Sequence, residues 1–180
     1  MVTTHNILDF WYKELTPKQW FQKSDELDAL ITERFTTILE KARQGECYVW
    51  RKEPEGRLAE ILVLDQFSRN IYRDLPESFA QDPMAIALAQ EAVALGVDKG
   101  MNDDQKSFLY MPYMHSESAL IHEQAVQLFD QPGLEEKLRF ELMHKNIIDR
   151  FGRYPHRNNI LGRTSTTEEL EFLEQPGSSF

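Results

Sequence analysis

Apolar residues recur every three or four positions along most of the chain, and this spacing is typical of amphipathic helices. The clearest case predicts a helix over Ser24–Gln44, with Ser24 as its N-cap and Gly45 at its end. Its predicted buried stripe is Leu27, Ile31, Phe35, Ile38, Leu39 and Ala42. Strand-like alternation is nearly absent from the sequence. The pattern therefore predicts an all-α protein with a single helical domain over residues 1–180.

The same spacing predicts further helices, and residues with special backbone preferences set their ends. They are expected over 57–72, 82–95, 102–111, 115–130, 134–151 and 166–173. Thr16-Pro17 offers a helix start, Asp82 is expected to cap the helix that begins there, and Thr166 is expected to cap the last one. Pro112 should end or kink its helix near Met111. The segment over 7–12 fits either a strand or a short helix.

Two of these helices have a predicted buried face. On the helix over 115–130, Glu117 aligns with Ile121 and Leu128, so an acid is expected to point inward. The stripe predicted for the helix over 134–151 is Phe140, Met143, Ile147 and Phe151, widened by Leu138, Leu142 and Ile148.

Composition excludes several classes of protein. The chain is 41% hydrophobic and 28% charged, which is ordinary for a globular protein. Its net charge of -10 argues against binding to nucleic acid or to an anionic membrane. No signal-peptide pattern and no apolar run near the roughly 20 residues of a membrane span occur. The single cysteine, Cys47, excludes an internal disulfide. We therefore expect a cytoplasmic protein.

One stretch near the end of the chain concentrates polar donors. This arginine segment, Phe151–Arg163, has no acidic residue, although the chain as a whole is acidic. Its polar members are Arg153, His156, Arg157, Asn158, Asn159 and Arg163. Arginine binds carboxylates and phosphates through two parallel hydrogen bonds and tolerates burial better than lysine. The segment therefore predicts the wall of a polar cleft.

Two other stretches place polar residues among apolar ones. Asp65, Gln66, Arg69 and Asn70 fall within two turns of the helix over 57–72. They could form a structural Asp65–Arg69 pair or line the cleft, and the spacing fits both. His115 and Glu117 stand where a helix is expected to begin, and negative charge is favoured there.

These three stretches, together with the aromatic segment over 7–12, carry a family resemblance. The sequences Ile7–Tyr12, Arg57–Arg73, Pro112–Glu117 and Arg150–Arg163 resemble, in this order, the patterns "LDFWF", "RLALILLLDQFPRNIYR", "PLMHSE" and "RFGRFPHRNAILGR". These patterns belong to the uncharacterised bacterial family called domain of unknown function 924. Tyr12, Ser68 and Tyr154 depart from them. The resemblance implies an all-helical fold similar to tetratricopeptide-like superhelices, and no activity.

The leading functional hypothesis is a cleft that binds a small anionic ligand. Guanidinium groups would grip the anion, amides would orient it, carboxylates would hold the guanidinium groups, and imidazoles would exchange protons. The predicted ligand-binding residues are Asp65, Gln66, Arg69, Asn70, Arg153, Arg157 and Asn158. The predicted catalytic residues, if the protein is an enzyme, are His156, His115 and Glu117.

Two alternatives remain open at this point. A tetratricopeptide-like interaction module would bind an acidic peptide in a helical groove. A metal site could form from His115, Glu117 and His156, with Asp65 as a further candidate ligand. Neighbouring arginines disfavour a cation, so no metal ligand is assigned. The sequence leaves open the ligand, the reaction, any cofactor and the oligomeric state.

Overall fold

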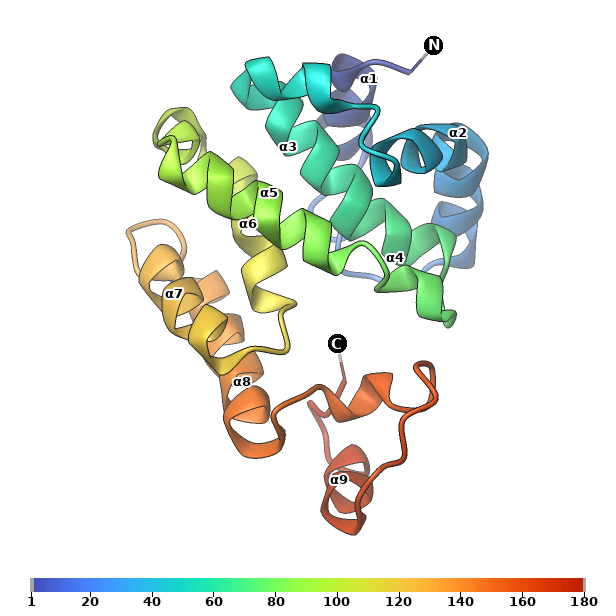
Figure 1. The fold of residues 1–180 in the computed structure, drawn as a ribbon, viewed down its shortest axis with the longest axis vertical. Helices are drawn as coiled ribbons and strands as arrows, with labels where there is room; N and C mark the ends of the chain where they lie inside the picture. The colour runs from blue at the N-terminus through green and yellow to red at the C-terminus, as the bar shows by residue number, and fades with distance from the viewer. Residues whose placement is uncertain (1, 180) are drawn as a thin grey trace. The chain divides into compact units, whose positions relative to one another are not determined.

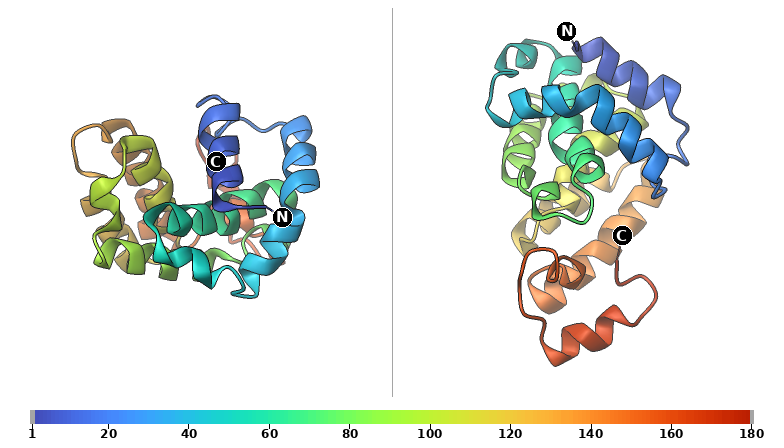
Figure 2. Two further views of the ribbon diagram at one scale, coloured as in Figure 1. Left: turned by 90° about the horizontal axis from the view of Figure 1, so that it is seen from above. Right: turned by 90° about the vertical axis from the view of Figure 1, so that its right-hand side faces the viewer.

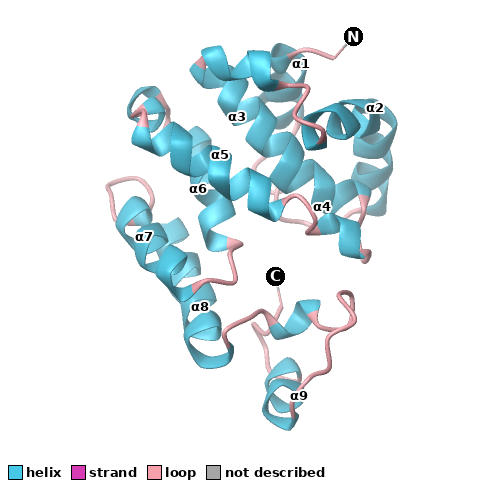
Figure 3. Ribbon diagram, in the orientation of Figure 1, coloured by secondary structure: helices cyan, strands magenta, loops and turns pink. Residues whose placement is uncertain are grey.

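The computed structural model describes residues 2–179, and every regular element among them is helical (Figures 1 and 3). The all-α prediction is confirmed, and no strand occurs in this range. Within the same range, no helix combines the length and the apolar character that crossing a membrane would require. The α-helices are α1 Thr4–Asp9, α2 Asp25–Arg43, α3 Pro54–Leu62, α4 Ser68–Ile71, α5 Asp82–Ala94, α6 Asp103–Met114, α7 Ala119–Phe129, α8 Glu135–Phe151 and α9 Thr167–Leu173.

Internal contacts divide the described chain into two compact units. The first unit holds the residues up to Arg73 together with Glu77–Pro112. The second unit holds Asp74–Pro76 together with the residues from Tyr113 onward. A single domain over the whole chain stays a prediction.

An aromatic cluster fills the centre of the first unit. The ring of Phe35 lies 4.7 Å from that of Phe67 and 5.0 Å from that of Phe10, and all three side chains are buried. Phe35 comes from α2, whereas Phe10 and Phe67 come from π-helical turns at Phe10–Glu14 and Val63–Phe67. The segment over 7–12 is therefore helical, which settles the choice that the sequence left open.

Helix α2 forms as its sequence predicts. Every position of the predicted stripe is buried, and the Ser24 hydroxyl accepts the backbone N–H of Leu27 at 3.2 Å.

The predicted helix over 57–72 begins earlier, at Pro54, and runs through α3, a π-helical turn and α4. Gly56 is required near its start, because a Cβ there would lie 2.0 Å from the carbonyl oxygen of Trp50.

Three expectations about helix ends differ from the structure, and the kink at Pro112 that the sequence also allowed stays a prediction. Residues 17–20 form a turn instead of a helix, since the Gln19 side chain accepts the backbone N–H of Thr16 at 2.9 Å and closes it. Helix α6 continues through Pro112 to Met114, where buried packing offsets the one lost backbone hydrogen bond. Asp82 does not cap α5, because its carboxylate is bound by Arg69 instead.

In the second unit, α7 and α8 pack side by side as a helical hairpin (Figure 2). The predicted stripe on α8 is partly wrong, since Leu142 and Met143 are 44% and 40% exposed. The buried positions are instead His122, Ala125 and Phe129 on α7 and Glu141, His144, Ile147 and Ile148 on α8. Polar groups occupy this interior because they bind one another, as described below.

The prediction that Glu117 lies on a helical stripe is also wrong. Helix α7 begins at Ala119, with Ser118 as its N-cap, so Glu117 precedes the helix. Its carboxylate nevertheless points into the second unit, where other residues hold it.

Helix α9 begins with the predicted cap: Thr166 and Glu169 form a reciprocal capping box.

Candidate functional site

The predicted site residues fall into two groups, one in each unit. Asp65, Gln66, Arg69 and Asn70 belong to the first unit. His115, Glu117, Arg153, His156, Arg157 and Asn158 belong to the second. In the first group the structure brings Asp65, Gln66 and Arg69 together, whereas Asn70 binds elsewhere. A single cleft that includes both groups stays a prediction.

In the first unit, Arg69 joins two carboxylates. Its guanidinium donates to both oxygens of Asp82 at 2.9 Å and lies 3.2 Å from Asp65 Oδ1. The Asp65 side chain is only 1% exposed, and Gln66 Nε2 donates to its Oδ2 at 2.6 Å. The Asp65–Arg69 pair that the spacing allowed is therefore present, and the sequence did not identify Asp82 as its third member.

Asn70 takes part in a separate ion pair. Its Nδ2 donates to Asp28 Oδ1 at 2.8 Å, and Asp28 also accepts two hydrogen bonds from the guanidinium of Arg73. Burial alone would raise the pKa of Asp28, but the hydrogen bonds from Arg73 and Asn70 outweigh it and lower that pKa. This group therefore ties α2 to the end of α4.

The second unit contains a segment that we call the polar loop, Met114–Ser118, between α6 and α7. Three successive carbonyl groups of the loop each accept a hydrogen bond from a side chain. Tyr154 Oη donates to Met114 O at 2.5 Å, Arg157 Nη2 to His115 O at 3.0 Å, and His122 Nε2 lies 2.8 Å from Ser116 O. Two of the three donors come from the arginine segment, so the two sequence stretches are bound to each other.

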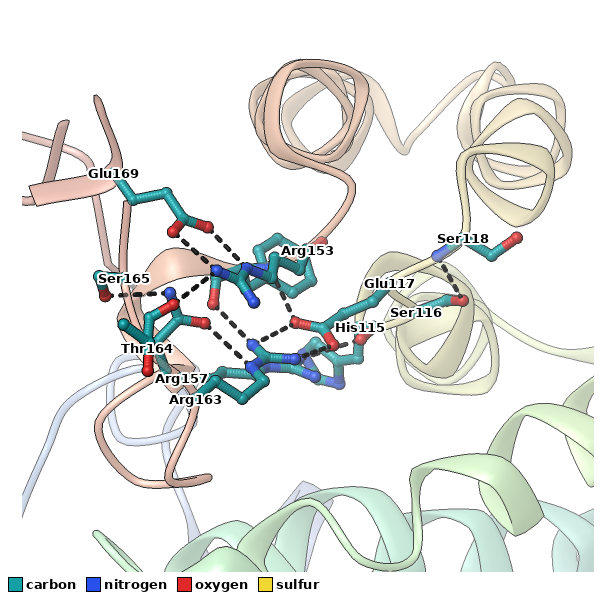
Figure 4. A network of polar contacts seen from close by, with 12 residues as sticks. His115, Ser116, Glu117, Ser118, Arg153, Arg157, Arg163, Thr164, Ser165 and Glu169 are labelled. Carbon is teal, nitrogen blue, oxygen red and sulfur yellow. Dashed lines mark hydrogen bonds and ion pairs between the residues drawn. The ribbon is translucent and has the colours of Figure 1, made fainter. Parts of the chain in front are cut away.

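Glu117 strengthens this attachment from the loop side (Figure 4). Both of its carboxylate oxygens accept hydrogen bonds from Arg163, at 2.6 and 2.9 Å, and Oε1 also accepts the backbone N–H of Tyr154 at 2.7 Å. Burial alone would raise the pKa of Glu117, but these hydrogen bonds lower it below the ordinary range. Glu117 is therefore a carboxylate at neutral pH, and it holds a guanidinium in place.

Arg153 binds a second internal carboxylate (Figure 4). Its Nε and Nη2 donate to Glu169 at 2.7 and 2.8 Å, and Nη2 also donates to Thr164 O at 2.9 Å. The hydrogen bonds from Arg153 are the main cause that lowers the pKa of Glu169 to about 2. Asn158 connects the two pairs, since its Oδ1 accepts from Arg163 Nε at 2.9 Å and a hydrogen bond from its side chain also lowers the pKa of Glu169. Its Nδ2 donates to Ser165 Oγ at 3.1 Å.

Tyr154 lies at the centre of the imidazole and guanidinium groups of the second unit. Its ring is 1% exposed, and the Arg157 guanidinium lies 4.6 Å from its centroid. The His156 ring lies 5.5 Å from the same ring. His115 and His156 are both half-buried. The two residues predicted to exchange protons are therefore partly exposed, although His156 Nδ1 itself is buried.

Sequence reasoning missed two polar residues of this unit. His122 and Glu141 are fully buried, and His122 Nδ1 lies 2.6 Å from Glu141 Oε1. A signal was available, because His122 stands in helical register with Ala125 and Phe129, and Glu141 with Ile148. A polar residue in register with a buried stripe needs a partner of its own.

The metal alternative gains no support from the geometry. Across residues 2–179, no group of three or more His, Cys, Asp or Glu side chains is arranged to hold a metal ion. The oxygens of Glu117 are bound by Arg163 and Tyr154.

A cavity of about 350 Å³ lies in the first unit. It is lined by Leu8, Asp9, Tyr12, Lys13, Asn102, Asp104 and Gln105, and none of these is a predicted site residue.

Fold and network together define an all-helical protein whose second unit is built around one polar network. The chain belongs to the family described as bacterial protein of unknown function (DUF924), whose model matches residues 7–177. A solved structure of a protein of unknown function from Agrobacterium tumefaciens is similar to it, with 37% sequence identity and a TM-score of 0.90. That likeness covers 95% of this chain and 96% of the other. Among curated proteins, no sequence matches this chain.

Proposed function

We propose that the second unit binds a small anionic ligand, a carboxylate or a phosphate, beside the polar loop. The observation that carries the proposal is the attachment of the arginine segment to this loop, with His115 and His156 left half-buried. A fixed loop with partly exposed imidazoles is a preorganised binding surface, so little ordering entropy is lost when a ligand binds.

The contacts of the arginines divide their roles. Arg153 and Arg163 each bind a carboxylate of the chain through two nitrogens, so we assign them to the support of the site. The ligand would meet the imidazoles of His115 and His156 and the guanidinium of Arg157, which lies 3.0 Å from the carbonyl oxygen of His115. Arg157 is only 6% exposed, so its positive charge would act on the ligand from within the unit, and that charge favours an anion over other ligands.

Binding is tested with phosphate, pyrophosphate and citrate at low ionic strength. At least one of them should raise the melting temperature, and a ligand at about one hundred times its dissociation constant stabilises by about 2.7 kcal/mol. His115→Gln and His156→Gln should weaken that ligand about tenfold or more, equivalent to about 1.4 kcal/mol. His5→Gln is the matched control, since this exposed histidine lies in the first unit. Equal shifts in all variants, or none in the wild type, would contradict the proposal.

Acid–base catalysis on the bound anion is the second part of the proposal. His115 and His156 would move the protons, and Glu117, kept as a carboxylate by Arg163, would fix the loop that carries His115. A phosphate-ester substrate should be turned over with a pH profile that His156→Gln changes and His5→Gln leaves alone. Binding of an anion without turnover would support the binding proposal and contradict the proposal of catalysis.

A second candidate, binding of an acidic peptide, is favoured by apolar side chains left exposed on the helices of the second unit. Leu120 is 63% exposed on α7, and Leu142 is 44% exposed on α8. Helical hairpins bind peptides in tetratricopeptide-like proteins through such surfaces. A fluorescent acidic peptide should then bind the wild type and lose affinity in Leu142→Ser. No change of anisotropy at high protein concentration would remove this candidate.

A further inference from the structure

A buried histidine–glutamate pair links the two helices of the hairpin in the second unit. His122 on α7 and Glu141 on α8 are both fully buried, with Nδ1 and Oε1 2.6 Å apart. Neither residue takes part in the proposed ligand contacts. A buried pair of this kind costs free energy unless its charges or protons are matched, so its protonation can be worked out from its neighbours.

The hydrogen-bond partners of His122 fix the position of one proton. Nε2 lies 2.8 Å from Ser116 O, and a carbonyl oxygen can only accept. Nε2 also lies 3.3 Å from Tyr154 Oη, whose own proton is donated to Met114 O. Both neighbours therefore present lone pairs, and Nε2 must carry a hydrogen.

The short contact on the other side of the ring requires a second proton. Without it, a lone pair of Nδ1 would face a lone pair of Glu141 Oε1 across 2.6 Å. One proton between the two atoms removes this repulsion, whether it resides on nitrogen or on oxygen. With that proton the pair has no net charge, which is the state that a fully buried site favours. Burial likewise raises the pKa of Glu141.

We propose that His122 and Glu141 share one proton and act as a positioning pair for the polar loop. The shared proton commits Nε2 as a donor to Ser116 O, and Tyr154 completes the set by holding Met114 O. The carbonyl groups on either side of His115 are thereby fixed from the interior. This inference does not depend on the proposed function, because the loop is held whether or not a ligand binds.

Other titratable groups of the second unit surround the pair. Lys145 on α8 lies close enough to influence Glu141 and also binds Asp149 at 2.6 Å. The remaining groups that face the pair or its partners are His144 on α8, His115 and Glu117 on the polar loop, and Tyr154, His156 and Arg157 on the arginine segment. Without the shared proton, an uncompensated charge would lie at the centre of these groups, so the proton is part of what holds the loop.

The protonation state is tested on the wild-type protein by nitrogen NMR of isotopically labelled histidine. The His122 ring should show a hydrogen on Nε2 and a hydrogen-bonded Nδ1 in the folded protein. A neutral ring with its hydrogen on Nδ1 alone, or an Nδ1 that makes no hydrogen bond, would overturn the proposal. This measurement needs neither a ligand nor a variant.

Two variants test the positioning role through amide exchange of Ser116 and Ser118, whose N–H groups are bonded inside the second unit. Glu141→Gln can donate an amide hydrogen to Nδ1 and keep the Nε2–H tautomer, so exchange should stay within about twofold of the wild type. Glu141→Leu leaves Nδ1 without a partner, and exchange should rise about tenfold or more. Glu123→Leu, at an exposed position on α7, is the control. Equal exchange in the two Glu141 variants, or in Glu141→Leu and Glu123→Leu, would refute the positioning role.

Discussion

The two units of the molecule have interiors of different character. The first unit is centred on aromatic rings from α2 and two π-helical turns, with ring centroids 4.7 and 5.0 Å apart. The second unit has a small apolar cluster at Ile147, Ile148 and Tyr154, and its helical hairpin encloses a histidine–glutamate pair. The stability that comes from burying apolar side chains does not depend on pH. The stability that comes from buried, hydrogen-bonded ionisable groups does depend on pH. The units should therefore respond differently to mutation and to acid.

The largest effect is expected in the aromatic core of the first unit. Phe67→Ala removes a fully buried ring and should lower the free energy of unfolding by about 4 kcal/mol, equally at acid and neutral pH. Tryptophan fluorescence follows this unit selectively, because the three tryptophans, at positions 11, 20 and 50, all belong to it. A loss below about 1 kcal/mol would mean that the rings do not form its core.

The next largest effect is expected at a buried charge, on which the stability of the first unit also depends. Glu60 is fully buried, and Arg51 donates to both its oxygens at 2.7 Å. Arg51→Met would leave this carboxylate without its partner and should cost about 3 kcal/mol. Arg43→Met removes an exposed partner of Glu40 and should cost less than about 1 kcal/mol. If urea unfolding shows equal losses of stability in Arg51→Met and Arg43→Met, burial does not determine the strength of these ion pairs.

Acid should affect the second unit through His144. Burial lowers the pKa of His144 to about 3 from an ordinary value of 6.5, so the unfolded chain binds its proton first. The stability contributed by the neutral imidazole is complete above the unfolded pKa and is lost as the pH falls from 6.5 toward 3. Between about pH 7 and about pH 5, this one group should cost about 2 kcal/mol.

The variant His144→Gln checks this assignment. Its loss of stability between the same two pH values should be smaller than that of the wild type by about 2 kcal/mol. Urea unfolding followed by the NMR signals of Ala125 and Ile147 reports the second unit. A pH dependence that is unchanged in the variant would show that other groups cause the acid sensitivity.

The smallest effect concerns the cap of α9. Thr166→Ala removes the acceptor for the Glu169 backbone N–H and should cost about 1 kcal/mol. Thr166→Ser keeps that acceptor and should restore most of the loss. Amide exchange in α9 is the measurement, and equal exchange in the two variants would argue against the capping box.

The contrast between the units also explains what the sequence could and could not predict. Helix α2 and the Thr166 cap were predicted correctly, because periodicity and capping are local properties of a few adjacent residues. The interior of the hairpin was predicted only in part: Ile147 and Ile148 are buried as expected, but a stripe drawn from hydrophobic residues alone excludes His122 and Glu141.

The sequence could not predict which residues pair with each other in the candidate site. The sequence indicated that the arginine segment and the polar loop interact, but it did not identify Glu169 as the partner of Arg153 or Asp82 as a partner of Arg69. These pairs join residues 16 and 13 positions apart and depend on how helices and turns pack. Helical spacing relates only near neighbours and contains no information on such pairs.

The most direct test of the account is a double-mutant cycle between Glu117 and Arg163, the pair that joins the polar loop to the arginine segment. The variants are Glu117→Gln, Arg163→Gln and their combination, and the free energy of unfolding of the second unit is read from amide exchange at Ala125 and Ile148. Both side chains are about a quarter exposed and share two hydrogen bonds, so a coupling energy of about 2 kcal/mol is predicted. A coupling below about 0.5 kcal/mol would mean that the two stretches do not depend on each other, and it would contradict the account.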